Sequence, residues 1–85
     1  MFGTRAIEAA VLARFDPGLT WPEIHELFVG VGRRQARRFV GEAEDAGHLR
    51  WIPPQRTRGV LRGRGRWVLT DRGRAFVRAS AEGTA

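Results

Sequence analysis

The apolar residues of this chain follow two different spacings, and the spacing changes near residue 48. Apolar residues recur every three or four positions, as in amphipathic helices, in four segments: residues 4–15, 21–29, 33–46 and 71–80. They alternate with polar residues in two shorter segments, residues 49–52 and 66–69, which predicts two antiparallel strands. The pattern therefore predicts an α+β fold with three helices, a β-hairpin and a C-terminal helix.

The first two helices are predicted from their caps and their inner faces. Thr4 can cap the first helix, and the residues expected on its inner face are Ile7, Ala10, Val11 and Phe15. Asp16-Pro17-Gly18 predicts a turn, and residues 19–21 are expected to be short and extended. Thr20 and Glu23 match a capping box that begins the second helix. The residues that this helix is expected to bury are Ile24, Leu27 and Phe28.

The third helix, residues 33–46, is predicted to be apolar on one side and basic on the others. Its apolar stripe consists of Ala36, Phe39, Val40 and Ala43. The polar side and its flanks carry Arg33, Arg34, Gln35, Arg37 and Arg38. Gly30 and Gly32 predict a tight turn before the helix, and Gly47 predicts its end. A helix docked on a core in this way can offer guanidinium groups to an anionic partner.

The hairpin predicted beyond Gly47 has a long, basic connection. The residues of its two strands that are expected to face the core are Leu49, Trp51, Trp67 and Leu69. We expect residues 53–65 to form an extended, mobile loop, part of which, residues 60–64, lengthens the second strand. Four arginines lie in this loop: Arg56, Arg58, Arg62 and Arg64.

Length and composition limit the number of domains, the kinds of site and the cellular location that we expect for the protein. A chain of 85 residues supports one domain, for which we expect residues 1–80, with residues 81–85 as a frayed tail. The absence of cysteine excludes disulfides and thiolate metal sites, and the two histidines lack carboxylates at metal-ligand spacing. No apolar run approaches the ~20 residues of a membrane span, and no signal peptide is legible. We expect a cytoplasmic, nucleoid-associated protein without metal, cofactor or membrane partner.

The positive charge is confined to one part of the chain. The net charge is +6, and every basic residue is an arginine. Residues 1–32 carry two arginines against four carboxylates, whereas residues 33–78 carry thirteen against four, a net charge of +9. Codon bias can explain arginine in place of lysine, but it does not explain this segregation. A basic segment of this kind is typical of a nucleic-acid-binding face.

Two motifs resemble a known family of DNA-binding proteins. The segment LTWPEIHELFVGVGRRQARRFVGEAEDAGHLRW resembles the short strand, second helix, turn, recognition helix and strand entry of the winged helix-turn-helix. RWVLTDRGRAFV resembles the Leu-Thr-x-x-Gly-Arg segment that closes the wing in MarR-like and PadR-like bacterial regulators. The resemblance, over residues 4–80, implies a three-helix winged helix-turn-helix with a two- or three-stranded antiparallel wing and a C-terminal helix. The arginine-rich wing and the lack of long flanking helices, through which those regulators dimerise, depart from the family.

The resemblance makes the arginines of the third helix and of the loop the candidate DNA-binding residues. Arg34 and Arg38 are the candidates for bidentate contacts to guanine, and Gln35 could pair with adenine. Arg33 and Arg37 are expected to grip phosphates. The loop arginines are expected on the backbone or in a narrow minor groove. The competing interpretation of the helix arginines is a solvated polar face, although like charges at i, i+4 destabilise a helix that has no anionic partner. The competing interpretation of the loop arginines is a disordered basic loop.

These features favour a sequence-specific, double-stranded DNA-binding protein, a small transcriptional regulator, over other functions. An architectural or excisionase-type DNA-bending protein is an alternative, and a winged-helix protein-interaction module is another. No paired carboxylates, nucleophile constellation or phosphate-binding loop suggests an enzyme. Whether the protein binds alone or as a homodimer on two half-sites stays open at this point.

Overall fold

The computed structural model describes residues 5–83, except for the side chains of residues 56, 57, 61, 62, 82 and 83. Within these residues the chain is α+β, with four helices and four short strands. In chain order they are α1 (Arg5–Ala13), α2 (Trp21–Leu27), α3 (Arg33–Asp45), β1 (Leu49–Ile52), β2 (Gln55–Thr57), β3 (Val60–Arg62), β4 (Arg66–Leu69) and α4 (Asp71–Gly83). Helix α4 continues three residues beyond its predicted end at Ser80.

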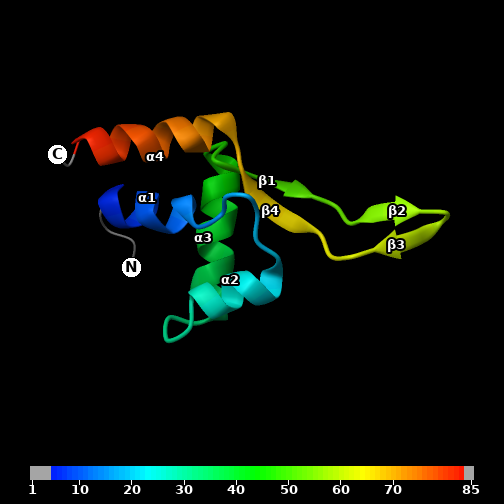
Figure 1. Ribbon diagram of the computed structural model, residues 1–85. Helices are drawn as coiled ribbons and strands as arrows, with labels where there is room; N and C mark the ends of the chain where they lie inside the picture. Colours follow the sequence, from blue (N-terminus) through cyan, green and yellow to red (C-terminus); the bar gives the residue numbers. More distant parts are fainter. Residues whose placement is uncertain (1–4, 84–85) are drawn as a thin grey trace.

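The helices form one body, from which the strands project as an arm (Figure 1). Helices α1 and α4 pack against each other, α3 runs across them, and α2 lies at the other end of α3. The arm extends away from the helices, so the molecule measures 49 × 28 × 19 Å. Helix α3 thus occupies the middle of the structure, between the α1–α4 pair, α2 and the base of the arm.

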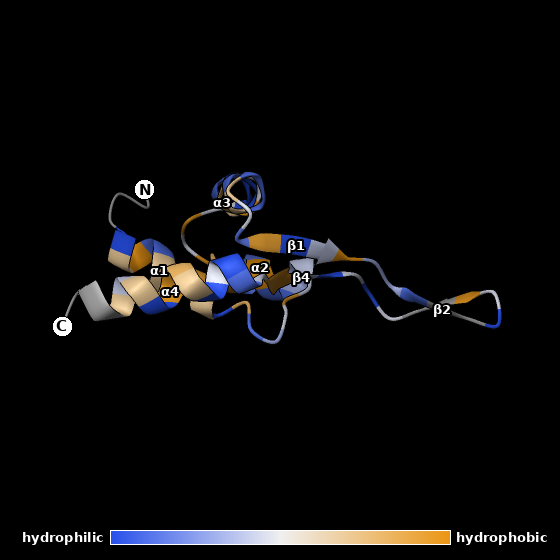
Figure 2. Cartoon of the chain, turned by 90° about the horizontal axis from the view of Figure 1, so that it is seen from above, coloured by the Kyte–Doolittle hydropathy of each residue, from blue (hydrophilic) through white to orange (hydrophobic). Residues whose placement is uncertain are grey.

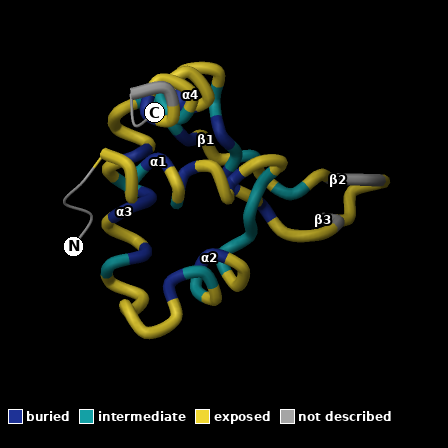
Figure 3. Tube along the Cα trace, turned by 60° about the vertical axis from the view of Figure 1, so that its left-hand side comes forward, coloured by how far each residue is buried: buried dark blue, intermediate teal, exposed yellow. Residues whose placement is uncertain are grey.

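Helix α3 supplies the centre of the hydrophobic core. All four residues of its predicted apolar stripe are buried: Ala36, Phe39, Val40 and Ala43. The Phe39 ring lies between those of Phe15 and Phe28, at centroid distances of 6.2 and 5.6 Å. Buried and exposed residues therefore alternate along α3 as the helix turns (Figure 3). Burying such a ring contributes about 1.5–3 kcal/mol, which fixes one side of α3 to the protein.

The inner face predicted for the first helix is wrong for Ile7 and Ala10 and confirmed for Phe15. Ile7 is 48% exposed and Ala10 is exposed, whereas Ala9 and Leu12 are buried together with Phe15 beyond the helix. Leu12 and Phe15 are large apolar residues three positions apart, so the helix turns to bury both of them. Ala9 lies on the same stripe of the helix and is buried with them, whereas Val11, at the edge of this stripe, is only half-buried. The proposed cap, Thr4, lies outside the described residues.

Helix α2 begins where the capping box predicts. The Glu23 carboxylate accepts hydrogen bonds from the main-chain N–H of Thr20 at 2.9 Å and from its hydroxyl at 3.0 Å. These hydrogen bonds lower the pKa of Glu23 below its ordinary value of 4.5, and the charge of Arg66 adds to the effect. Leu19, just before the cap, exchanges two main-chain hydrogen bonds with Trp67, so the short extended segment joins β4 at the base of the arm.

The base of the arm follows the predicted hairpin. Strands β1 and β4 are antiparallel, with Leu49 opposite Leu69 and Trp51 opposite Trp67. Leu49, Trp67 and Leu69 are buried, as predicted. Trp51 is on the same face but is 40% exposed, because it lies beyond the helices and packs on the Trp67 ring at 5.5 Å. Gly65 permits this packing, since a Cβ there would occupy the space of the Trp51 ring.

The outer part of the arm is a second hairpin and not the extended loop that we expected. Strands β2 and β3 pair with Gln55 opposite Arg62 and Thr57 opposite Val60. The two-residue turn between them, Arg58-Gly59, has positive φ at both positions, 54° and 78°, as a type I′ turn requires. Arg-Gly is a weaker hairpin signal than Asn-Gly or Asp-Gly, so the turn was missed. The predicted lengthening of the second strand occurs, but as a separate strand over residues 60–62.

The end of α3 is joined directly to the start of α4. Gly47, at φ +81°, ends α3 with two hydrogen bonds of the Schellman type, from Gly47 N to Glu44 O and from His48 N to Ala43 O. The Thr70 hydroxyl donates to the Gly47 carbonyl at 2.5 Å and accepts from the Gly73 N–H at 3.0 Å. The Leu-Thr-x-x-Gly-Arg motif therefore has a structural role: it fixes the direction of α4 relative to α3.

The two glycines inside helices give a matched test of this junction. A Cβ at Gly73 would fall against the main-chain carbonyl oxygen of His48 and 2.8 Å from Cδ1 of Leu69, whereas a Cβ at Gly41 would meet nothing within 4 Å. We expect Gly73→Ala to lower the free energy of unfolding by about 2 kcal/mol through overpacking. Gly41→Ala should raise it by about 0.5–1 kcal/mol, because alanine favours a helix. Urea denaturation followed by circular dichroism measures both, and equal stability of the two variants would contradict the packing described.

Candidate nucleic-acid interface

Helix α3 turns its arginines away from the core. Arg33, Arg34, Arg37 and Arg38 are all exposed. Figure 2, which looks along α3, shows that its outward side is largely hydrophilic. Because its apolar stripe is fixed by burial, the helix cannot rotate to cover these side chains. The four guanidinium groups therefore share the outer surface of the first two turns.

The start of α3 adds further positive charge to this surface. The turn before it uses the left-handed region at Gly30 (φ +85°) and Gly32 (φ +112°), as predicted. Gly32 is the N-cap and provides no side-chain acceptor for the first N–H groups of the helix. Uncapped N–H groups and the helix dipole favour anions at such an end. Val29 and Val31, which flank Gly30, are 80% and 53% exposed beside it.

The arginines of α3 differ in their partners. Arg38 Nε lies 3.1 Å from a carboxylate oxygen of Glu42, one turn further along, with side chains 61% and 69% exposed. Among the side chains that the structure describes, none forms a hydrogen bond or an ion pair with the side chain of Arg33, Arg34 or Arg37. The pairing of Arg38 was not predicted. An exposed i, i+4 pair contributes only about 0.3–0.5 kcal/mol, so Arg38 remains accessible to a stronger partner.

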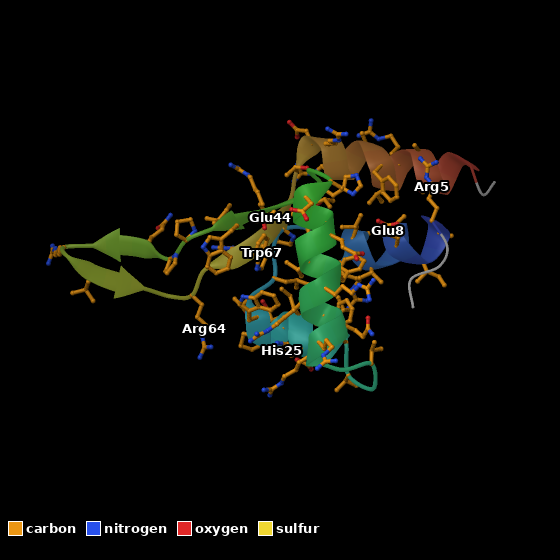
Figure 4. All side chains as sticks on the ribbon, turned by 180° about the vertical axis from the view of Figure 1, so that it is seen from behind. Arg5, Glu8, His25, Glu44, Arg64 and Trp67 are labelled. Atoms are coloured by element: carbon orange, nitrogen blue, oxygen red, sulfur yellow. The ribbon has the colours of Figure 1, made fainter. Side chains whose placement is uncertain are left out.

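The other predicted DNA-binding residues, Gln35 and the arginines of the arm, differ in exposure and position. Gln35 is half-buried on the flank of α3, unlike its arginine neighbours. Arg58 is exposed at the tip of the arm, and Arg64 extends from the arm near its bend (Figure 4). The side chains of Arg56 and Arg62 lie outside the described part of the chain. The structure thus brings the helix arginines together, whereas the described arm arginines are distributed along an elongated hairpin.

Two arginines outside α3 and the arm are occupied within the fold: Arg74 from the basic segment and Arg5 from the acidic part of the chain. Arg74 binds Asp16 at 3.5 Å and Asp71 at 3.3 Å. Arg5, from the other end of the chain, donates to Ser80 Oγ at 3.0 Å and lies over the Phe76 ring at 5.1 Å. These contacts hold α1, α4 and the turn after α1 together. Arg74 is therefore less available to an external anion than its place in the basic segment suggests.

A depression lies beside the arginine-rich face, between α2, α3 and β4. Its volume is about 510 Å³, and its lining includes Trp21, His25, Arg37, Gly41, Glu44 and Trp67. Figure 4 shows Glu44, His25 and Trp67 on the same side of α3. The ring of Trp21 is edge-on to that of Trp67, with centroids 6.2 Å apart, and lies 5.7 Å from that of His25. Arg37 belongs to both surfaces.

Sequence reasoning missed this depression. Glu44 is exposed, and Trp21 and Trp67 pack on the core, but nothing in the local sequence shows that these residues border one depression. The signal present in the sequence was the i, i+4, i+7 spacing of Arg37, Gly41 and Glu44, which places them on one stripe of α3. That stripe borders the apolar stripe, but only the tertiary fold shows that two tryptophans face it.

Among the described residues, no three His, Asp or Glu side chains come together in a way that could hold a metal ion. None of the described helices is both long and apolar enough to cross a membrane.

Comparison with known proteins gives no relative. The chain matches no protein-family model, no curated protein and no solved structure.

The Arg38–Glu42 pair provides a test of whether Arg38 is available to an external partner. We expect Glu42→Gln to change the free energy of unfolding by no more than about 0.5 kcal/mol, and the change to disappear in high salt, because both side chains are exposed. Chemical denaturation at low and high ionic strength measures it. A loss of about 1.5 kcal/mol or more would mean that Glu42 holds Arg38 in place and removes it from the interface.

Proposed function

We propose that this protein binds double-stranded DNA as a winged helix-turn-helix and acts as a small transcriptional regulator. In this proposal α2 and α3 are the helix-turn-helix, and the arm is the wing. The observation that carries it is the exposure of Arg33, Arg34 and Arg37, without partners in the described chain, on a helix whose opposite side is buried. An anionic partner offsets the mutual repulsion of these charges.

Duplex DNA fits the dimensions of this surface. Helix α3 has 13 residues and is therefore about 20 Å long, and the major groove, about 12 Å wide, admits a helix. We assign a base contact to Arg34 and phosphate contacts to Arg33 and Arg37. Arg38 can join them by exchanging Glu42 for a DNA acceptor. Gln35, being half-buried, has a smaller part than its neighbours.

The arm supports a second point of contact. It is a narrow two-stranded ribbon with Arg58 at its tip, and Arg64 lies closer to the helices. With α3 in the major groove, a projecting basic ribbon is suited to the adjacent backbone or minor groove. A protein that acts in this way works at the chromosome and needs no catalytic group or cofactor.

The salt dependence of binding tests the electrostatic part of this proposal. If about six phosphates are neutralised, the logarithm of the binding constant should fall against the logarithm of salt concentration with a slope near −5. Fluorescence anisotropy with a labelled random duplex, repeated over a range of salt concentrations, gives the slope. A slope near zero, or no binding at low salt, would overturn the proposal.

A selected duplex tests the recognition part. Selection from a random duplex library provides a preferred site, and symmetry in the recovered sequence would report a two-fold dimer. We expect Arg34→Ala to weaken binding to that site by about 1–3 kcal/mol and to random DNA much less, because a base contact is lost.

Arg14→Ala is the matched control for this substitution. Arg14 is an exposed arginine just after α1, in the acidic part of the chain, so its replacement removes the same charge outside the proposed interface. It should change neither affinity by more than about twofold. Equal losses for Arg34→Ala on both DNAs would reassign Arg34 to the backbone, and equal effects of the two variants would contradict the placement of the interface.

A further inference from the structure

The depression between α2, α3 and β4 has features that the proposed DNA contacts do not use. Its volume of about 510 Å³ falls within the range of small-molecule sites, roughly 300–1,000 Å³. Two aromatic side chains, Trp21 and Trp67, contribute to its walls, and Arg37 and Glu44 contribute opposite charges from α3. Aromatic walls with a few convergent polar groups are typical of sites for planar organic ligands.

Gly41 widens this depression at a cost to the helix. A glycine in the middle of a helix is less favourable than alanine. Packing gives no reason for it, since a Cβ at this position would meet nothing within 4 Å. Gly41 is part of the lining, between Arg37 and Glu44 on the same stripe. The missing side chain leaves room for another molecule to approach α3 closely.

Polar atoms without partners also lie in the lining residues. Trp67 is 9% exposed, and its indole Nε1–H is buried without an acceptor within the described chain. Nε2 of His25 is likewise buried without a partner there. Native proteins leave few buried polar atoms unsatisfied, and those that remain require a reason such as a missing ligand. A ligand that carries an acceptor could supply the partner of the Trp67 N–H after a small adjustment of the ring.

The two charged groups of the lining determine which hydrogen-bonding groups a ligand must carry. Arg37 and Glu44 are two helical turns apart, a rise of about 10.5 Å. Neither side chain has an ion pair or a hydrogen bond to the described part of the chain. The Glu44 carboxylate repels phosphate and requires donors, whereas the Arg37 guanidinium requires acceptors. The ligand expected here is a flat ring with donors on one edge and acceptors on another.

We propose that this depression binds a guanine base whose Watson–Crick edge is free. Guanine presents two adjacent donors, N1–H and the N2 amino group, to a carboxylate, and two acceptors, O6 and N7, to an arginine. Adenine lacks the paired donors, and guanine in a duplex has its Watson–Crick edge covered by cytosine. The indole rings of Trp21 and Trp67 provide apolar surface for the ring.

Two sources can supply such a base, a free guanine nucleotide or a single-stranded nucleic acid. Because Arg37 borders both surfaces, a bound base would compete with duplex DNA, a consequence that rests on the proposed function. Binding of the base itself does not depend on the proposed function, and the test below contains no duplex.

The experiment follows the indole N–H resonance of Trp67 by NMR in the full chain. Guanosine monophosphate, added up to millimolar concentration, should shift it saturably, and adenosine monophosphate should bind about tenfold more weakly or worse. A single-stranded oligothymidine with one central guanine forms the second arm. Whichever of the two guanine ligands binds more tightly identifies the source. Absence of a saturable shift with either guanine ligand, or equal binding of the adenine nucleotide, would overturn the proposal.

Three variants assign the contacts. Glu44→Gln should weaken the binding of guanosine monophosphate by about tenfold. Asp45→Asn removes a charge from the next residue, which lies outside the depression, and should change this affinity by less than about twofold. Gly41→Ala should weaken binding while the melting temperature rises, a combination that misfolding cannot produce. Unchanged affinity in Glu44→Gln, or equal losses in Glu44→Gln and Asp45→Asn, would overturn the assignment of Glu44 as the acceptor.

Discussion

Burial of one side of α3 is the constraint on which the rest of the structure depends. Phe39 and Val40 pack at the centre of the core, against the residues that follow α1 and those that end α2. A close-packed interior resists rotation of the helix, because any rotation would open a cavity and expose apolar area. The opposite side must therefore face outward. Its arginines are displayed as a consequence of the core and not by contacts of their own.

The ends of α3 set where that displayed surface points. Gly30 and Gly32 allow α2 to turn into it, and Gly47 ends it in a hydrogen-bonded cap to which Thr70 binds. The arm leaves from the same junction, so α3 and the arm are positioned by one set of main-chain contacts. This geometry gives α3 two adjacent surfaces: a basic one toward solvent, and a depression toward α2 and β4.

Helical periodicity predicted the parts of the fold that local sequence determines. The buried stripe of α3, the capping box at Thr20 and the glycine at the end of α3 are all confirmed. The face of α1 was predicted only in part: Phe15 is buried as expected, but an alanine-rich helix leaves the choice of stripe to its tertiary partners, which bury Leu12. The outer hairpin and the depression depend on backbone geometry or long-range packing, which spacing along the chain does not encode. The Arg38–Glu42 pair is different, because its i, i+4 spacing was legible in the sequence.

The most direct measurement of the central claim is NMR mapping of the ¹⁵N-labelled protein with a short DNA duplex. The account predicts that main-chain and arginine side-chain resonances of residues 30–38 and of the arm change, while those of α1 and α4 do not. The affected arginines should include Arg34, which is exposed on α3. Changes confined to α1 and α4, or none at low salt, would contradict the claim that the outward side of α3 binds DNA.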